Sequence, residues 1–172
     1  MAYLLDANCF IHAKNLYYGF DVCPGFWDWL EIAAQEGNVL SIDAVYDEIV
    51  PGGDELSGWA RAHPTMFLPS TSSVLAELGN VNQWAQTSTR YTAGAKTDFA
   101  GNADSRLVAF GAADGHRIVT HELPGLNKKN TIKIPDAAAA HNVKCVQLHN
   151  VLRSLGAKFV LPPGRVAQGR LL

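Results

Sequence analysis

The sequence has little charge, few cysteines and no long hydrophobic run. Charged residues make up only 17% of its 172 positions, and the three cysteines are Cys9, Cys23 and Cys145. An odd number of cysteines without a C-x-x-C pair argues against a disulfide framework or a zinc site, so we expect small buried thiols. No apolar run reaches the roughly 18 residues that a membrane span needs, and no charged leader precedes the first apolar segment. We therefore expect a cytoplasmic protein without membrane contact.

Several catalytic and cofactor-binding motifs are also missing. No G-x-G-x-x-G follows an apolar segment and no G-x-x-x-x-G-K-[ST] occurs, which removes the main support for dinucleotide-binding and P-loop proteins. No serine stands in G-x-S-x-G, the nucleophile elbow of many hydrolases. A phosphatase with an aspartyl nucleophile would need a second carboxylate two residues after Asp6, where the chain has Asn8. None of the six histidines has zinc spacing with a cysteine, and we expect structural roles for them, with His121 the best exception because it adjoins Glu122.

What is present fits one globular domain. Hydrophobic residues make up 48% of the chain, and a chain of this length can bury roughly 70% of the surface of its unfolded state. We expect a single domain over residues 1–160 and a C-terminal tail over residues 161–172, where Pro162, Pro163 and Gly164 interrupt the pattern.

Charge is distributed unevenly along the chain. Residues 1–122 carry 6 basic and 15 acidic side chains, whereas residues 123–172 carry 8 basic side chains and one acid, Asp136. Such asymmetry is typical of a protein with a nucleic-acid or acidic partner, although pairing between the protein's own halves would explain it equally well. A nuclease needs a basic flank beside an acidic site, because its polyanionic substrate is otherwise repelled.

Short apolar segments alternate with segments of helical periodicity. The expected strands cover residues 3–5, 39–42, 66–68, 117–120, 131–134 and 144–146. The expected helices cover residues 8–18, 26–35, 43–50, 56–63, 73–86, 104–113, 137–140 and 148–155. The polar, weakly periodic residues 87–101 are expected to form the longest loop, which leads into Asp104. The alternation predicts an α/β domain with a mostly parallel sheet.

Four acids follow or adjoin the expected strands: Asp6, Glu48, Asp104 and Glu122. Because the carboxyl ends of parallel strands lie at one edge of a sheet, we expect the four carboxylates to meet there. An ionised carboxylate in a buried place is costly unless positive charge is held near it, and no cation is close to these acids in sequence. The cluster therefore indicates a divalent cation.

Mg²⁺ or Mn²⁺ suits such a cluster, because both prefer oxygen ligands and are usually held by a few carboxylates and a substrate phosphate. A bound ion of this kind activates water and stabilises charge on the phosphate, so the acids suit phosphodiester hydrolysis without a protein nucleophile. Each acid also has an ordinary explanation: Asp6 as a helix cap, Glu48 as a surface acid, and Asp104 as a helix-initiating acid favoured by the dipole.

The residues around the acids resemble a PIN domain. The resemblance rests on Leu4 to Asn8, Val45 to Ile49, Ala103 to Ala109 and Ile118 to Glu122, and spans about residues 2–155. More narrowly, the chain is similar to PIN-like proteins formerly described as a domain of unknown function, of the DUF4411 type. In that subgroup the patterns Val119-Thr120-His121-Glu122 and Lys133-Ile134-Pro135-Asp136 recur.

The resemblance implies a three-layer α/β/α sandwich and a Mg²⁺- or Mn²⁺-dependent ribonuclease. Proteins of this kind are often toxins with a small antitoxin partner, and many are homodimers. Asp6, Glu48 and Asp104 match the three main acids, and Glu122 stands where most members carry Asp. The polar positions that orient the acids or water match Asn8 and Thr120.

From these residues we expect one or two ions between Asp6, Asp104 and Glu122, with Glu48 binding metal or acting through water. The side chains expected to contact RNA phosphates are Arg106, Lys128, Lys129 and Lys133. Two other interpretations stay open: a catalytically silent PIN-like binding module that acts through protein or RNA contacts, and a phosphatase or nucleotide hydrolase. The aromatic residues near the first helix can stack on bases or pack in a core or dimer face, and we favour packing; they are Tyr17, Tyr18, Phe20 and Trp27.

Overall fold

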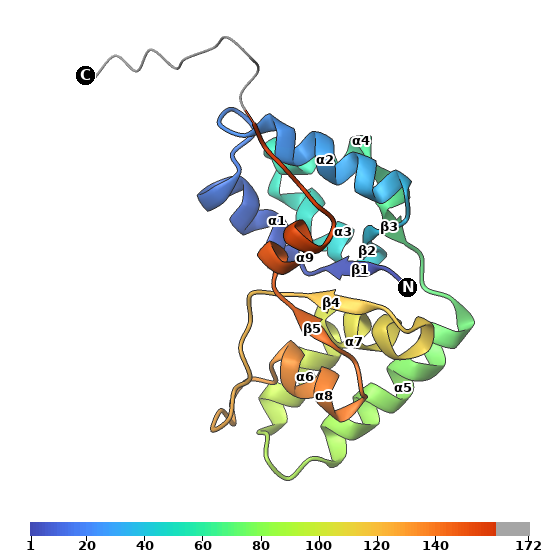
Figure 1. Ribbon diagram of the computed structural model, residues 1–172. Coiled ribbons are helices and arrows are strands. Elements are labelled where there is room, and N and C mark those ends of the chain that lie inside the picture. Colours follow the sequence, from blue (N-terminus) through green and yellow to red (C-terminus); the bar gives the residue numbers. More distant parts are fainter. Residues whose placement is uncertain (161–172) are drawn as a thin grey trace, which may run out of the picture.

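Five short parallel strands form one sheet through the centre of the molecule (Figure 1). In this computed structural model, which describes residues 1–160, the strands lie in the order β3-β2-β1-β4-β5. They are β1 (Tyr3–Leu5), β2 (Val39–Ile42), β3 (Phe67–Leu68), β4 (Arg117–Val119) and β5 (Cys145–Val146). Helices flank this sheet on both sides, which confirms the predicted three-layer α/β/α sandwich. The expected tail, residues 161–172, lies outside the described residues.

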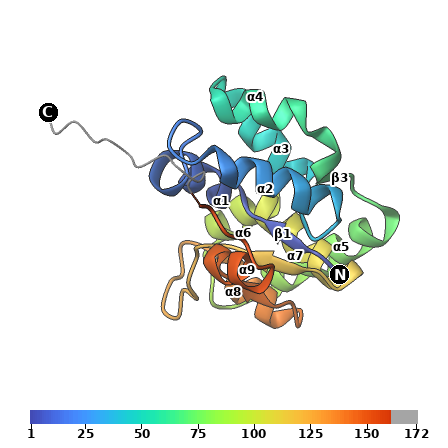
Figure 2. The same cartoon turned by 45° about the horizontal axis from the view of Figure 1, so that its top comes forward.

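Nine α-helices occur within residues 1–160. They are α1 (Ala7–His12), α2 (Pro24–Gln35), α3 (Asp43–Ile49), α4 (Glu55–Ala62), α5 (Ser72–Thr87), α6 (Ala93–Gly101), α7 (Ala103–Asp114), α8 (Ile134–Ala140) and α9 (Leu148–Ser154). In two views of the molecule, α3 and α4 lie on the β3 side of the sheet and α8 lies at its opposite end (Figure 1 and Figure 2). None of the helices described is long and apolar enough to cross a membrane.

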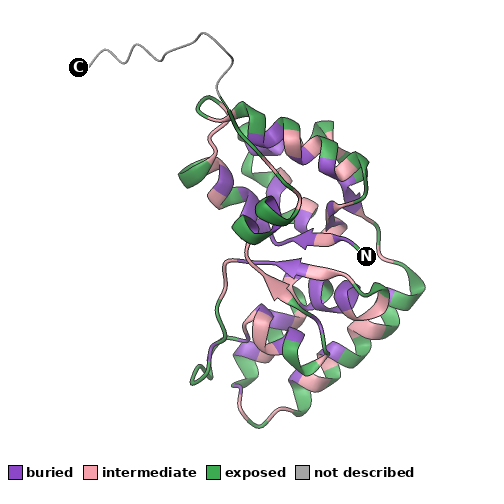
Figure 3. Cartoon of the chain, viewed as in Figure 1, coloured by how far each residue is buried: buried purple, intermediate pink, exposed green. Residues whose placement is uncertain are grey.

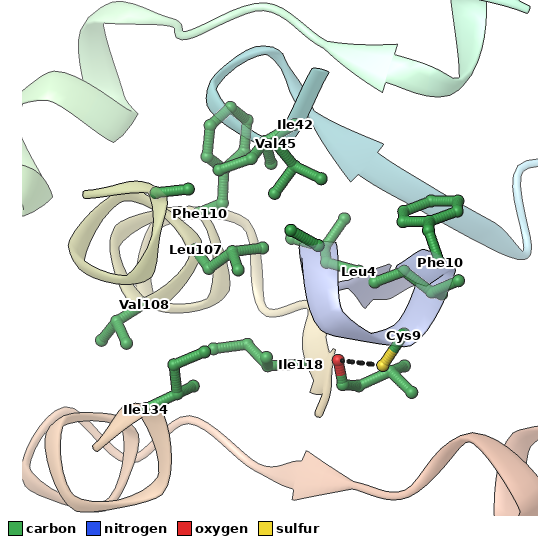
Figure 4. Close-up of a cluster of buried hydrophobic side chains, with 14 of the residues drawn as sticks. Leu4, Cys9, Phe10, Ile42, Val45, Leu107, Val108, Phe110, Ile118 and Ile134 are labelled. Carbon is green, nitrogen blue, oxygen red and sulfur yellow. Dashed lines mark hydrogen bonds between the residues drawn. The ribbon is translucent and has the colours of Figure 1, made fainter. Parts of the chain in front are cut away.

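The hydrophobic core forms where α7, α3 and α8 meet the central strands. Leu107 and Phe110 of α7 lie beside Leu4 and Ile42, and Ile134 of α8 lies toward Ile118 (Figure 4). All six side chains are at most 1% exposed. Buried residues concentrate in the strands and on the helix faces that meet them, while the outer helix faces are exposed (Figure 3). Burial on both faces explains why the strands read as continuous apolar runs in sequence.

The strand order places a topological switch point between β1 and β4. The chain passes from β1 to β2 and β3 on one side, and then crosses to β4 and β5 on the other side. Leu4 therefore pairs with Leu40 on one side and with Ile118 on the other. Side chains that follow β1 and β4 at their carboxyl ends lie beside the crevice where open α/β sheets usually bind ligands.

Two predicted elements were wrong. Residues 87–101 are not one long loop, because Thr92 caps the helix α6: its side chain accepts a hydrogen bond from the backbone of Ala95 at 3.3 Å. This helix has no clear apolar face, since only Ala95 and Phe99 are buried. Residues 131–134 are not a strand, because Ile134 begins α8 and Pro135 occupies the first turn, a position that proline favours in helices.

Two other expectations hold only in part. The first expected helix consists of α1 and a π-helical segment over Ala13–Tyr17. In the π-helical segment, i→i+5 hydrogen bonds replace the i→i+4 bonds of an α-helix. Of the cysteines, only Cys9 is fully buried, and its thiol donates to the carbonyl oxygen of Val119 at 3.2 Å (Figure 4). Burial raises the pKa of the Cys9 thiol well above its ordinary value, as expected for an inert core cysteine.

Candidate active site

Asp6 and Thr120 meet at the switch point. Asp6 follows β1 and Thr120 follows β4, and both are almost fully buried, with exposures of 2% and 1%. The Thr120 hydroxyl donates to Oδ2 of Asp6 at 3.0 Å, and Oδ1 of Asp6 accepts a longer bond, 3.4 Å, from the backbone of Asn8 at the start of α1. Asp6 therefore caps α1, as its ordinary explanation requires, while its carboxylate remains at the sheet edge that can bind a ligand.

The environment of Asp6 disfavours its negative charge. Burial raises the pKa of Asp6, and the hydrogen bonds from Thr120 and Asn8 lower it in part. The charges of Glu122 and Glu48 raise the pKa of Asp6 further. A buried carboxylate near other acids is a common feature of functional sites, because a bound ligand can supply the missing positive charge.

Asp104 lies in the first turn of α7 and is the most strongly shifted acid of the group. Burial, the largest cause, and the charges of Asp6, Glu122 and Glu48 together raise the pKa of Asp104 to about 7. Lys133 partly offsets it. The position at a helix N-terminus would by itself favour a negative charge, so burial and like charges dominate here.

Glu48 connects α3 to α7. It is exposed on α3, and its Oε1 accepts a hydrogen bond from the backbone N–H of Ala103 at 3.2 Å. Ala103 is the first residue of α7, so this bond satisfies one of the free N–H groups at the helix start. Glu48 thus lies next to Asp104 and helps to fix the turn that carries it.

Glu122 is engaged by a cation that the sequence pattern did not reveal. Its Oε1 forms an ion pair with Lys133, and its Oε2 accepts a bond of 2.9 Å from the backbone of Ile134. Its own backbone N–H donates to the Thr120 hydroxyl at 3.1 Å. No cation is close to the four acids in sequence, but the fold brings Lys133 to Glu122 from 11 residues away.

The segment between Glu122 and Lys133 is held by a second set of contacts. Asp136 accepts a hydrogen bond from the backbone of Gly125 at 3.1 Å, and Arg90 donates to the carbonyl oxygens of Gly125 and Lys128. Arg90 also lies 3.6 Å from the Asp136 carboxylate. Asp136 therefore positions this segment.

The remaining predicted substrate contacts lie at the surface. Asn8, Arg106, Lys128 and Lys129 are exposed, whereas Lys133 is half-buried against Glu122. Lys128 and Lys129 extend from the turn that Arg90 holds. Of these basic residues, Lys133 contacts an acid of the group, through its ion pair with Glu122.

The chain matches the family model described as "Domain of unknown function (DUF4411)" over residues 3–159. This chain belongs to the DUF4411 family. The predicted membership of the DUF4411 family is thereby confirmed. No curated protein and no solved structure matches the chain.

In this DUF4411 protein the acids share one edge but do not form a closed ligand set. Within residues 1–160, no three His, Cys, Asp or Glu side chains stand close enough together to hold a metal ion. The reason is local: Thr120 binds Asp6, Ala103 binds Glu48, and Lys133 binds Glu122. The donor chemistry nevertheless fits a hard divalent cation, since all four groups are carboxylates and each ionised acid raises the pKa of Asp104. For three of these carboxylates to hold one cation, their side chains would have to rotate, and Glu122 would also have to leave Lys133.

Two hollows adjoin the acids of the DUF4411 site. A cavity of about 170 Å³ beside Asp104 is lined by Asp98, Asn102 and Asn130, among others. A second, of about 320 Å³, lies beside Thr120 and Glu122. Sequence reasoning missed Asp98 because residues 87–101 were expected to form a loop; a Thr92 cap would have indicated the helix that brings Asp98 near Asp104.

Proposed function

We propose that this protein is a PIN-like, Mg²⁺- or Mn²⁺-dependent endoribonuclease. The observation that carries the proposal is the gathering of Asp6, Glu48, Asp104 and Glu122 at the carboxyl edge of the sheet, where burial and like charges raise the pKa of Asp104. Nothing in the fold requires four acids to gather at the switch point of a parallel sheet, and ordinary surface acids would repel each other less. A divalent cation relieves this repulsion and at the same time binds phosphate.

The chain's own residues have distinct roles in this proposal. Asp6 and Asp104 hold the cation, and Glu48 lies beside Asp104 to bind the cation or a water molecule. Thr120 fixes the orientation of the Asp6 carboxylate through the 3.0 Å hydrogen bond. When bound, the cation supplies an activated water and stabilises negative charge on the phosphate. Glu122 joins the ligands only if its ion pair with Lys133 opens.

RNA is the proposed substrate because the PIN-like resemblance implies it and because exposed basic side chains lie in the segment that follows Glu122 and in the helix that carries Asp104. Exposed Lys128, Lys129 and Arg106 can contact phosphates on either side of the cleaved bond. Three further parts of the proposal rest on the PIN-like resemblance alone. They are that the protein is a toxin, that an antitoxin binds it, and that it forms a homodimer.

The proposal is tested by incubating purified protein with a pool of structured and single-stranded RNA in Mn²⁺, Mg²⁺ or chelator. We expect cleavage with metal only, and loss of cleavage in Asp6→Asn, which keeps an oxygen acceptor for Thr120 but removes the charge. Asp28→Asn, an exposed acid on α2, is the matched control and should cleave normally. Normal metal-dependent cleavage by Asp6→Asn would refute the metal site.

A second candidate is a catalytically silent PIN-like binding module. The ion pair between Lys133 and Glu122 favours it, because Lys133 supplies positive charge where the nuclease proposal needs a metal ion. In a silent module this pair would be permanent, and the protein would bind its partner without cleaving it.

Replacing Lys133 with Met separates the two candidates. If the cation site is functional, removing the competing ammonium should tighten Mn²⁺ binding by about three- to tenfold, which is about 0.7–1.4 kcal/mol. Calorimetric titration measures this, with Lys144→Met, an exposed lysine, as the control. A Lys133→Met protein that binds no Mn²⁺ and melts at a lower temperature would instead support the silent module.

A further inference from the structure

A pocket with aromatic walls lies next to the acids and takes no part in the proposed chemistry. It has a volume of about 290 Å³ and is lined by Tyr17, Tyr18, His121, Gln147, Leu148 and His149. This volume is at the low end of the range for small-molecule sites, roughly 300–1,000 Å³. The pocket therefore suits one or two flat rings rather than a large ligand.

The π-helical segment shapes one wall of this pocket. It ends at Tyr17, whose side chain is left 58% exposed while Tyr18 turns into the aromatic cluster with Phe26. The Tyr17 ring lies 6.3 Å from the His121 ring, centroid to centroid. Single π-helical turns are frequent at functional sites. We expected the aromatic residues near the first helix to pack in a core or dimer face. Trp27 is buried, as expected, whereas Tyr17 is exposed.

His121 contributes its ring to the pocket wall. Its Nε2 is shielded from solvent and has no hydrogen-bond partner among residues 1–160. Because this nitrogen is shielded, a ligand in the pocket meets the surface of the His121 ring rather than the nitrogen. A flat ring packs well against such an aromatic surface.

The chain itself joins this pocket to the acidic site. Thr120, which binds Asp6, and Glu122, which lies beside Asp104, are the two neighbours of His121 in sequence. A phosphate at the carboxylates and a ring beside His121 would thus contact consecutive residues of one segment. Phosphate and base are separated by one sugar in RNA, so a single nucleotide can reach both places.

We propose that this pocket binds an unpaired nucleobase of single-stranded RNA next to the phosphate that is cleaved. The proposal rests on the ribonuclease function proposed above, which it deepens. A base inside a duplex is stacked on both sides and cannot enter, whereas an unpaired base can stack on Tyr17. The pocket thereby selects single-stranded substrate.

The test is binding of a fluorescent six-nucleotide single-stranded RNA in chelator, where no cleavage occurs. Tyr17→Ala should weaken binding about tenfold, because one base-aromatic stack contributes roughly 1–3 kcal/mol. Tyr17→Phe, which keeps the ring, should bind like the unchanged protein. Leu16→Ala, a substitution of the exposed neighbour outside the pocket, is the control for local structure. Inorganic polyphosphate should bind Tyr17→Ala and the unchanged protein equally, because it has no bases.

Three outcomes would overturn the pocket assignment: equal RNA affinity of Tyr17→Ala and the unchanged protein, an equal loss of polyphosphate binding, or conversion of a dimer to a monomer by Tyr17→Ala. The last would show that a second copy of the chain covers the pocket. The ribonuclease proposal fails separately, if the protein binds RNA through Tyr17 but never cleaves it with metal present.

Discussion

Asp104→Asn should abolish RNA cleavage and at the same time make the metal-free protein more stable at pH 8. Cleavage should fall about a hundredfold or more, because Asp104 is one of the proposed ligands of the catalytic cation. Stability should rise because Asn needs no ionisation in a buried, negatively charged place. The raised pKa, about 7 against an ordinary 3.8, sets an upper limit of about 4 kcal/mol, and screening of this half-buried side chain reduces the expected gain to about 1–2 kcal/mol.

The pH dependence identifies the source of that gain. Unfolded Asp104 ionises near pH 4, but the folded carboxyl keeps its proton up to about pH 7, so the metal-free protein loses stability as pH rises between these values. Thermal unfolding in chelator should therefore show no advantage of Asp104→Asn at pH 4 and an advantage of about 2–8 °C at pH 8. Asp47→Asn, an exposed acid on α3, should show neither effect. An equal gain at both pH values would mean that charge is not the cause.

Gly111→Ala should destabilise the fold, although alanine normally strengthens a helix. Gly111 lies within α7, and a Cβ at this position would overlap Cγ1 of Val143 and stand 3.2 Å from Cγ2. Overpacking costs about 1–3 kcal/mol, against a gain of about 1 kcal/mol in helix propensity. We expect a net loss of up to about 2 kcal/mol in the free energy of unfolding, measured by denaturant titration.

Two variants make the cause of this loss visible. Gly79→Ala in α5, where no heavy atom lies within 4 Å of the added Cβ, should stabilise the protein by about 0.5–1 kcal/mol. Val143→Ala should recover much of the loss when combined with Gly111→Ala, so the two substitutions should be clearly non-additive. Additive effects would show that the contact between α7 and Val143 does not limit the packing.

The sheet could be predicted from sequence because its strands are buried on both faces. Five of the six expected strands match β1 to β5, and each is a short apolar run. The strand predicted over residues 131–134 was wrong. Ile132 and Ile134 are buried, but Ile132 precedes α8 and Ile134 is its first residue. Burial alone cannot separate a strand from a helix start, whereas Pro135 in the first turn could have done so.

The candidate site could be predicted only in its acidic half. Asp6 and Thr120 directly follow strands, so their place at the sheet edge follows from parallel pairing. Lys133 lies in a segment without regular structure, and nothing in its sequence neighbourhood indicates that it contacts Glu122. The same holds for the pocket beside His121, since it depends on a π-helical turn, for which the helical periodicity of residues 8–18 gave no signal.

The central place of β1 has a consequence for protein synthesis. This strand is made first, yet its second neighbour β4 begins more than a hundred residues later, at Arg117. A nascent chain that ends before β4 leaves one side of β1 without backbone partners, and it has neither Thr120 to orient Asp6 nor Glu122 beside Asp104. If the chain cleaves RNA as proposed, the ribosome that makes it is therefore not exposed to an assembled nuclease site until β4 and the residues that follow it have been translated.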